Sequence, residues 1–236
     1  MKIVTCQSLH IGIVGCSAAG AALCYRTICE EGAALMGPHA LPEVSMHTPS
    51  LALYVECLER DDRQGVADLM LASARKLAGA GADFLICPDN TIHLAFDLVQ
   101  AASPLPWLHI AEEVAATAVQ RGYRRVGITG TDWLMGSEVY PAVLRNKGLD
   151  FVLPNAKDRA RLNGIIMDEL VCGIIKPESV GEFLNIIDRL KDAGCDAVIL
   201  GCTELPLIVN DDNSNLPTLD STRLLARAAL RRAIAR

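Results

Sequence analysis

The chain has 236 residues, about half of them hydrophobic and a fifth charged, and its formal net charge is −6. This composition is ordinary for a globular protein and allows one large domain or two small ones. Scattered Lys and Arg residues argue against a nucleic-acid partner, and neither a membrane-spanning run nor a signal-peptide pattern occurs, so we expect a cytoplasmic protein.

Short apolar runs alternate with longer helical patterns along the chain. The first half predicts strands at 11–14, 44–47 and 84–87 and helices at 18–31, 62–80 and 92–102. The second half predicts strands at 126–129, 151–153 and 197–200 and helices at 138–147, 158–172 and 177–193. Unpunctuated apolar strands that alternate with helices indicate an α/β fold, with parallel sheets covered by helices on both faces.

One segment occurs twice, about half a chain length apart. Gly81–Thr91 aligns without gaps on Gly194–Glu204, which places Asp89 opposite Cys202. His10–Cys16 aligns on Arg125–Thr131 in nearly the same register. We therefore expect two pseudo-symmetric lobes, residues 1–112 plus 213–236 and residues 113–212, with the active-site cleft between them.

The other motifs that could carry chemistry are weak. The nine cysteines show no pairing pattern, so we expect most of them to be reduced core residues. No Cys-x-x-Cys or His-Glu-x-x-His motif occurs, and we expect no metal site. The spacing of Gly12, Gly15 and Gly20 does not match a dinucleotide-binding loop.

Polar residues follow four of the predicted strands. They lie in the segments Gly15–Ser17, Pro88–Thr91, Gly130–Thr131 and Gly201–Thr203. In parallel sheets ligands bind beyond the carboxyl ends of strands, and helix N-termini there favour an anion such as a carboxylate. Asp89 and Cys202 are the ionisable pair in these loops; the alternatives are a helix-capping aspartate and an inert core cysteine.

Taken together, these segments resemble the cofactor-independent aspartate/glutamate racemases of the Asp/Glu/hydantoin racemase superfamily. The resemblance covers nearly the whole chain and rests on Asn90–His93, Pro106–Ile110, Gly130–Thr131, Gly201–Pro206 and Asp220–Thr222. It implies two pseudo-symmetric α/β lobes, a homodimer, neither pyridoxal phosphate nor metal, and one cysteine from each lobe beside the substrate's α-carbon.

The chain departs from this pattern at the first cysteine. Asp89 occupies that position, while Cys87 lies two residues earlier. We assign Asp89 as one base and Cys87 as a packing residue, because Asp89 matches Cys202 in the repeat. A carboxylate is a weak base unless burial or a like charge raises its pKa.

Inverting a carbon requires one group to remove its proton from one face and another to return a proton to the opposite face. Cys202 and Asp89 are the predicted pair. Short polar side chains suit the substrate α-carboxylate, and we expect it at Asn90, Thr91, Thr131 and Thr203. Further candidate substrate-binding residues are Ser17, His47, Thr48, Ser137 and Lys176. We expect His93 and His109 to orient loops or to pack.

The sequence thus predicts racemisation of a small acidic amino acid, aspartate or glutamate, with no nucleic-acid or membrane partner. Two alternatives remain open. One is a decarboxylase or isomerase of the same superfamily that uses Cys202 alone. The other is a non-catalytic protein that binds an acidic amino acid.

Overall fold

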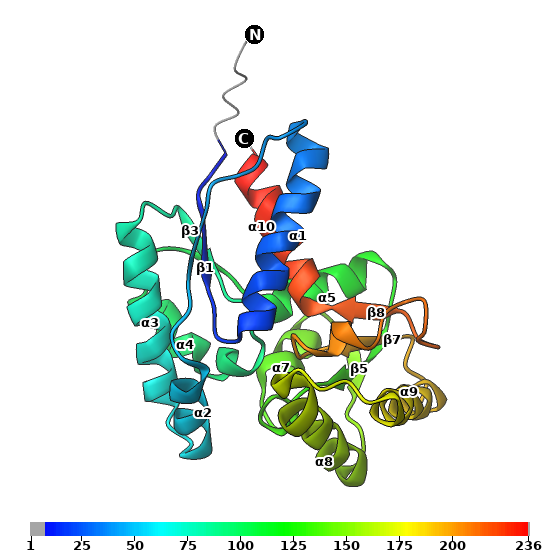
Figure 1. The fold of residues 1–236 in the computed structure, drawn as a ribbon. Helices are drawn as coiled ribbons and strands as arrows, with labels where there is room; N and C mark the ends of the chain where they lie inside the picture. Colours follow the sequence, from blue (N-terminus) through cyan, green and yellow to red (C-terminus); the bar gives the residue numbers. More distant parts are fainter. Residues whose placement is uncertain (1–7, 236) are drawn as a thin grey trace. The chain divides into compact units, whose positions relative to one another are not determined.

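The computed structural model describes residues 8–235, and its parallel strands form two four-stranded sheets (Figure 1). The first sheet has the order β2-β1-β3-β4 and the second the order β6-β5-β7-β8. Their bounds are β1 Ile11–Val14, β2 Val44–His47, β3 Phe84–Ile86, β4 Trp107–Leu108, β5 Arg125–Thr129, β6 Asp150–Val152, β7 Ala197–Leu200 and β8 Thr218–Asp220. The two halves therefore repeat one strand order, as expected from the doubled segment.

The chain divides into two units, each with one sheet. The first unit contains the residues up to Ile110 and those from Leu225 onward, and the second is the continuous segment Ala111–Leu224. The second crossing between units lies later than the expected boundary at residue 213. The reason is that β8 pairs with β7 and so stays with the second sheet.

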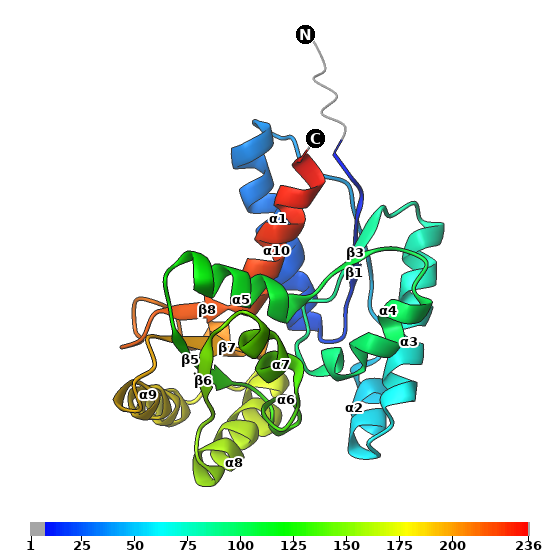
Figure 2. The ribbon, with the colours of Figure 1, turned by 180° about the vertical axis from the view of Figure 1, so that it is seen from behind.

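Helices cover the first sheet on both faces. They are α1 Ala18–Met36, α2 Leu51–Glu59, α3 Arg63–Gly79, η1 Thr91–Ala95 (a 3₁₀ turn), α4 Phe96–Ala102 and α10 Ser221–Ile234, which begins in the second unit. Side chains alternate along β1: Ile11 and Ile13 pack with α1 and α10, whereas Val14 packs with α2 and α3. Figures 1 and 2 show these two layers on either side of β1 and β3.

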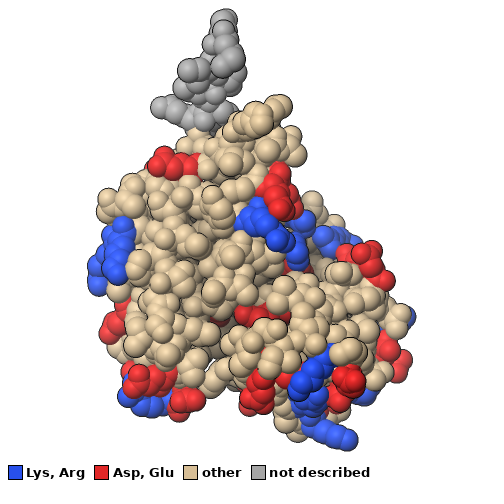
Figure 3. All heavy atoms as spheres, in the orientation of Figure 1, with Lys and Arg blue, Asp and Glu red and all other residues tan. Residues whose placement is uncertain are grey.

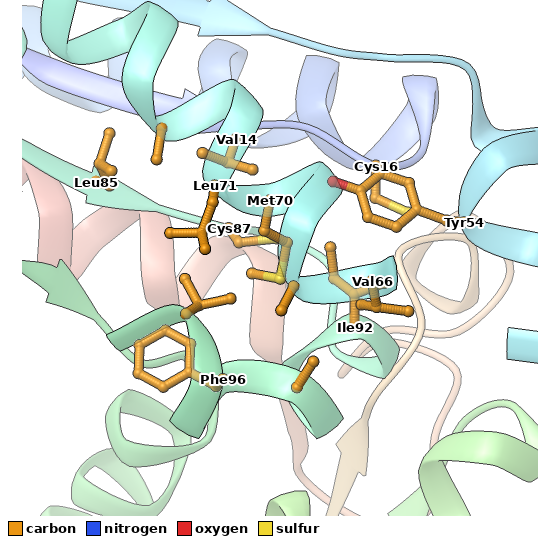
Figure 4. Close-up of a cluster of buried hydrophobic side chains, with 14 of the residues drawn as sticks. Val14, Cys16, Tyr54, Val66, Met70, Leu71, Leu85, Cys87, Ile92 and Phe96 are labelled. Atoms are coloured by element: carbon orange, nitrogen blue, oxygen red, sulfur yellow. The ribbon is translucent and has the colours of Figure 1, made fainter. Parts of the chain in front are cut away.

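The α3 face holds a large apolar cluster (Figure 4). Met70 and Leu71 of α3, Leu85 of β3 and Phe96 of α4 lie in it, together with the side chain of Tyr54. Cys87 also lies there, and like Tyr54 it is fully buried.

The second unit has its own core. Its helices are α5 Ile110–Gln120, which starts at the unit boundary, α6 Asp132–Met135, α7 Val139–Asn146, α8 Ala156–Gly164 and α9 Pro177–Asp192, with a 3₁₀ turn η4 at Leu205–Leu207. Between α8 and α9 the chain forms a π-helical turn η2 at Ile165–Glu169 and a 3₁₀ turn η3 at Leu170–Cys172. Val198 and Leu200 of β7 pack against this layer.

The α/β class and the parallel sheets are as predicted, and so are most of the strands. The expected helix 158–172 is wrong in part, because it becomes α8 and two turns of different pitch. The elements α2, β4, α5, α6 and β8 were not predicted. Of the two strands among them, β4 has only two residues and β8 has one apolar residue, so neither forms a recognisable apolar run.

The described cysteines are thiols rather than disulfides. Most of them are buried, as expected, but Cys172 is exposed, and Cys6 lies outside the described residues. Within residues 8–235, no helix is both long and apolar enough to cross a bilayer. Basic and acidic side chains are interspersed on the face shown in Figure 3.

Candidate functional site

In each sheet the chain adds one strand on one side of the first strand and then adds the others on the opposite side, so the strand order reverses between two neighbouring strands. β1 leads to β2 on one side and β3 leads to β4 on the other; β5 and β7 have the same relation in the second sheet. Ligands of parallel sheets bind beyond the carboxyl ends of such strand pairs. Asp89 follows β3, and Cys202 follows β7, so each lies at the reversal point of its own sheet.

Cys202 is half-buried and has a carboxylate partner. Its Sγ donates to Glu204 Oε2 at 3.0 Å, and Thr203 Oγ1 donates to the same oxygen at 2.6 Å. Thr203 and Glu204 are both buried. A buried carboxylate that accepts two hydrogen bonds is firmly oriented, and it can also take up the thiol proton.

The sequence pattern predicts no role for Glu204, which is the last residue of the repeated segment Gly194–Glu204. The available signal was an acidic residue in the loop that follows the buried strand β7. Thr203, which the sequence pattern places among the residues for the substrate α-carboxylate, donates to Glu204 and shares this acceptor with Cys202.

Two glycines let the loops of the second unit approach each other. A Cβ on Gly201 would lie 2.5 Å from the carbonyl oxygen of Thr129, and one on Gly130 would lie 3.0 Å from the carbonyl oxygen of Gly201. Backbone atoms cannot yield as a flexible side chain can. The glycines therefore fix the spacing of the loops that carry Thr131 and Cys202.

In the first unit, the loop at Asp89 is held by His93. The Nδ1 of His93 lies 2.7 Å from the backbone oxygen of Asp89, and because that oxygen only accepts, Nδ1 carries the hydrogen. Burial lowers the pKa of His93 well below its usual value, and His109 adds to this effect. His93 is therefore neutral and orients the loop, as expected from the sequence, while the Asp89 side chain is half-buried.

Cys87 lies in the core rather than at the loop. Its side chain is fully buried, and its Sγ is 3.8 Å from the backbone oxygen of Asp89. Burial raises the pKa of the Cys87 thiol well above its usual value, and the Asp89 charge raises it further. This cysteine is thus a poor source of thiolate, which agrees with its assignment as a packing residue.

Several of the proposed substrate-binding hydroxyls have structural partners. Ser17 Oγ accepts from Gly20 N at 3.1 Å and caps α1, and Thr131 Oγ1 accepts from Leu134 N at 3.2 Å and caps α6. Ser137 Oγ donates to the backbone oxygen of Leu134 at 2.8 Å. Asn90 and Thr91 are buried where η1 begins.

His47 is engaged on both ring nitrogens. Lys76 Nζ lies 2.8 Å from Nε2 and Ser73 Oγ lies 2.9 Å from Nδ1. Because an ammonium only donates, Nε2 accepts and Nδ1 carries the hydrogen. Burial lowers the pKa of His47, and the positive charge of Lys76 lowers it further. The neighbouring Thr48 is exposed, and its hydroxyl packs against Gly15, where a Cβ would come within 2.5 Å.

Lys176 is exposed and precedes α9, and its ammonium forms an ion pair with Glu169 at 3.4 Å. A cavity of about 600 Å³ lies nearby between α8 and α9. Its charged lining pairs internally, as Asp158 with Arg189 and Arg161 with Glu182, and none of the expected site residues lines it. Among residues 8–235, no three His, Cys, Asp or Glu side chains gather as metal ligands would.

The sequence of residues 11–229 matches the family model described as Asp/Glu/Hydantoin racemase. The chain belongs to this family. Its membership identifies it as an isomerase of the amino-acid racemase class.

Individual relatives agree with this membership. The chain is 24% identical to the broad specificity amino-acid racemase RacX of Bacillus subtilis over 172 residues, which are 72% of this chain and 73% of RacX. A crystal structure from Yersinia pestis, assigned as an Asp/Glu racemase, is 31% identical in sequence, with a TM-score of 0.87. The match covers 96% of this chain and 99% of the Yersinia chain. An aspartate racemase homologue from Pyrococcus horikoshii is 29% identical, with a TM-score of 0.82, and the match covers 95% of this chain and 98% of the Pyrococcus chain.

Proposed function

We propose that this chain racemises an acidic amino acid, aspartate or glutamate, without pyridoxal phosphate, and that Cys202 and Asp89 are its two acid/base groups. The observation that supports this most directly is the hydrogen bond from Cys202 Sγ to Glu204. It links a half-buried thiol to a buried carboxylate at the end of β7, where a proton can be held or released.

In the proposed reaction one group takes the α-proton while the other supplies a proton to the opposite face. When the Cys202 thiolate takes it, protonated Asp89 donates; in the reverse direction the Asp89 carboxylate takes it and the Cys202 thiol donates. Each turnover leaves the pair in the opposite state. The substrate α-carboxylate would be bound by Asn90, Thr91, Thr131 and Thr203, with Ser17, His47, Thr48, Ser137 and Lys176 completing the proposed site.

The decisive experiment is proton NMR of each enantiomer of aspartate and glutamate with the enzyme in deuterated water. Loss of the α-proton signal together with formation of the other enantiomer is expected. Because the relative RacX is named for broad specificity, the panel should include asparagine, glutamine and a basic amino acid. Exchange on a neutral or basic amino acid alone would reject the proposed substrate class.

Cys202→Ser tests the first group. Its hydroxyl is a far weaker acid than a thiol, so α-proton exchange and racemisation should both fall by at least about 100-fold. Cys195→Ser is the matched control, because Cys195 is a buried thiol on the loop before β7. Undiminished exchange in Cys202→Ser would remove this thiol from the mechanism.

Asp89→Asn tests the second group and separates the alternatives. The two-base reaction should lose racemisation from both enantiomers. Cys87 lies buried in the core and cannot replace Asp89. A one-base reaction that uses Cys202 alone would survive the change. Release of carbon dioxide from a malonate-type substrate would then identify a decarboxylase. Tight binding of aspartate by the unmodified protein with no deuterium incorporation would instead indicate a binding protein.

The homodimer and the cytoplasmic location also belong to this proposal. Sedimentation velocity of the full chain at micromolar concentration should give a species of twice the chain mass of 25.3 kDa. A single species at the chain mass would reject the dimer.

A further inference from the structure

A buried carboxylate lies beside Lys176 in the second unit. The Glu169 side chain is only 7% exposed, and it ends the π-helical turn η2. Its Oε2 accepts from Ser179 Oγ at 2.5 Å. Its Oε1 lies 3.4 Å from Lys176 Nζ and 3.5 Å from Arg161 Nη1.

The positive charges beside Glu169 are balanced by nearby carboxylates. Arg161 also pairs with Glu182 and donates to Ser179 Oγ at 3.2 Å. The hydrogen bond from Ser179 lowers the pKa of Glu169, and Lys176 and Arg161 lower it further against the opposing effect of burial. Glu169 is therefore ionised at neutral pH, and two carboxylates balance the two cations of this cluster.

Lys176 is the member of the cluster that solvent reaches most easily. Its side chain is 52% exposed, against 40% for Arg161. Lys176 thus presents its ammonium outward while Glu169 holds it from the buried side. Any external carboxylate that binds the ammonium must approach the Glu169 carboxylate as well.

We propose that Glu169 sets substrate preference, by competing with the substrate's side-chain carboxylate for Lys176. This rests on the proposed function, in which Lys176 belongs to the substrate-binding residues. Glu169 offsets part of the attraction of Lys176 for an aspartate or glutamate side chain. It exerts no such effect on the amide of asparagine or glutamine, which has nearly the same shape and no charge. Glu169 is therefore a specificity-determining residue that moderates the preference for acidic substrates.

The test compares Glu169→Gln with Glu182→Gln. Both changes remove one carboxylate from Arg161, but only Glu169 contacts Lys176. The readout is the ratio of kcat/KM for aspartate to that for asparagine, and likewise for glutamate and glutamine. Glu169→Gln should raise the ratio about tenfold, mainly through a lower KM for the acid, since like charges several ångströms apart repel by an amount of that order. Glu182→Gln should leave it within about twofold.

Two further variants exclude a merely structural effect. Ser179→Ala removes the hydrogen bond to Glu169 but keeps its charge, so the ratio should stay within about twofold while thermal stability falls. In a Lys176→Gln background, Glu169→Gln should no longer raise the ratio, because the competition for Lys176 is gone. An unchanged ratio in Glu169→Gln, or the same rise without Lys176, would overturn the proposal.

Failure of the proposed function gives a different result. If the unmodified protein racemises neither aspartate nor glutamate but binds them, calorimetry replaces kinetics, and the ratio of the dissociation constants of aspartate and asparagine should shift about tenfold in Glu169→Gln. A protein that binds neither amino acid would reject both proposals. Racemisation with an unchanged ratio would reject only the role of Glu169.

Discussion

Glu204 is a buried carboxylate that accepts a hydrogen bond from the Cys202 thiol. Its carboxylate accepts from the thiol and disfavours a neighbouring thiolate. Glu204→Gln should therefore shift the pH midpoint of Cys202 alkylation by iodoacetamide downward. It should also reduce kcat by about 100-fold, because no carboxylate would remain to take up the thiol proton and regenerate the thiolate. Glu138→Gln, which changes an exposed carboxylate paired with Arg145, is the control for both measurements. An unshifted alkylation midpoint would contradict a direct link between Glu204 and the thiol.

The Tyr54 hydroxyl is buried, and among residues 8–235 it makes no hydrogen bond of good geometry, although Ser73 lies close enough to lower its pKa. Ser73 is the polar side chain beside it, and the hydrogen bonds of Ser73 go to His47 and Leu69. An unsatisfied buried hydroxyl costs about 1–3 kcal/mol. Tyr54→Phe should therefore raise the free energy of unfolding in urea by up to this amount. Ser73→Ala, which loses the bond to His47, should lower the free energy of unfolding. Destabilisation by Tyr54→Phe would show that the hydroxyl has a partner, either Ser73 or a buried water.

At the scale of elements, the ends of β5 and β7 approach each other closely because Gly201 has no side chain. Gly201→Ala would place a methyl group 2.5 Å from a backbone oxygen of β5 and 2.6 Å from Leu134 Cδ2. We expect a loss of about 1–3 kcal/mol in the free energy of unfolding. Displacement of the Cys202 loop should also lower kcat. Circular dichroism with urea and the racemisation assay check the two effects.

Gly181→Ala is the matched control for this prediction. Gly181 lies inside α9, where a Cβ would meet nothing within 4 Å. Alanine in a helix interior is about 1 kcal/mol more favourable than glycine. The control should therefore stabilise the protein, and equal destabilisation by both changes would show that the close approach at Gly201 is unimportant.

Elements with a strong pattern could be predicted from the sequence, and the others could not. The apolar runs of β1, β2 and β7 were found at their observed bounds. β8 was missed because its three residues include only one apolar side chain, Leu219, and so form no apolar run. The π turn was missed because a change of helical pitch leaves the apolar pattern almost unaltered. Asp89 and Cys202 could be singled out because their segments repeat. Glu204 could not, because its role depends on where its carboxylate points.

At the scale of the whole molecule, two histidines inside the first unit link stability to pH: His93 is buried and His109 is half-buried. Burial lowers the pKa of His109 from 6.5 to about 4 and that of His93 well below 6.5. The unfolded chain therefore binds protons that the folded chain does not. Stability should fall as the pH falls from about 6.5 to about 4, by up to about 3 kcal/mol for His109 alone.

Urea unfolding at a series of pH values measures this effect. His109→Phe keeps an aromatic ring beside Phe96 and His93 but removes the titrating group, so its stability should depend less on pH in this window. An equally steep loss of stability in His109→Phe would assign the effect to other groups.

The path of the chain between the units has a consequence for biosynthesis. The second unit is continuous, but Leu225, Ala226, Ala229 and Ala233 of α10 complete the core of the first unit around Ile11 and Phe84. A nascent chain usually folds its N-terminal domain first. Here the N-terminal segment must wait for the last helix to leave the ribosome, whereas the second unit can fold as soon as its own residues have emerged. Premature termination after Leu224 would therefore leave the first unit, rather than the second, exposed to aggregation and proteolysis.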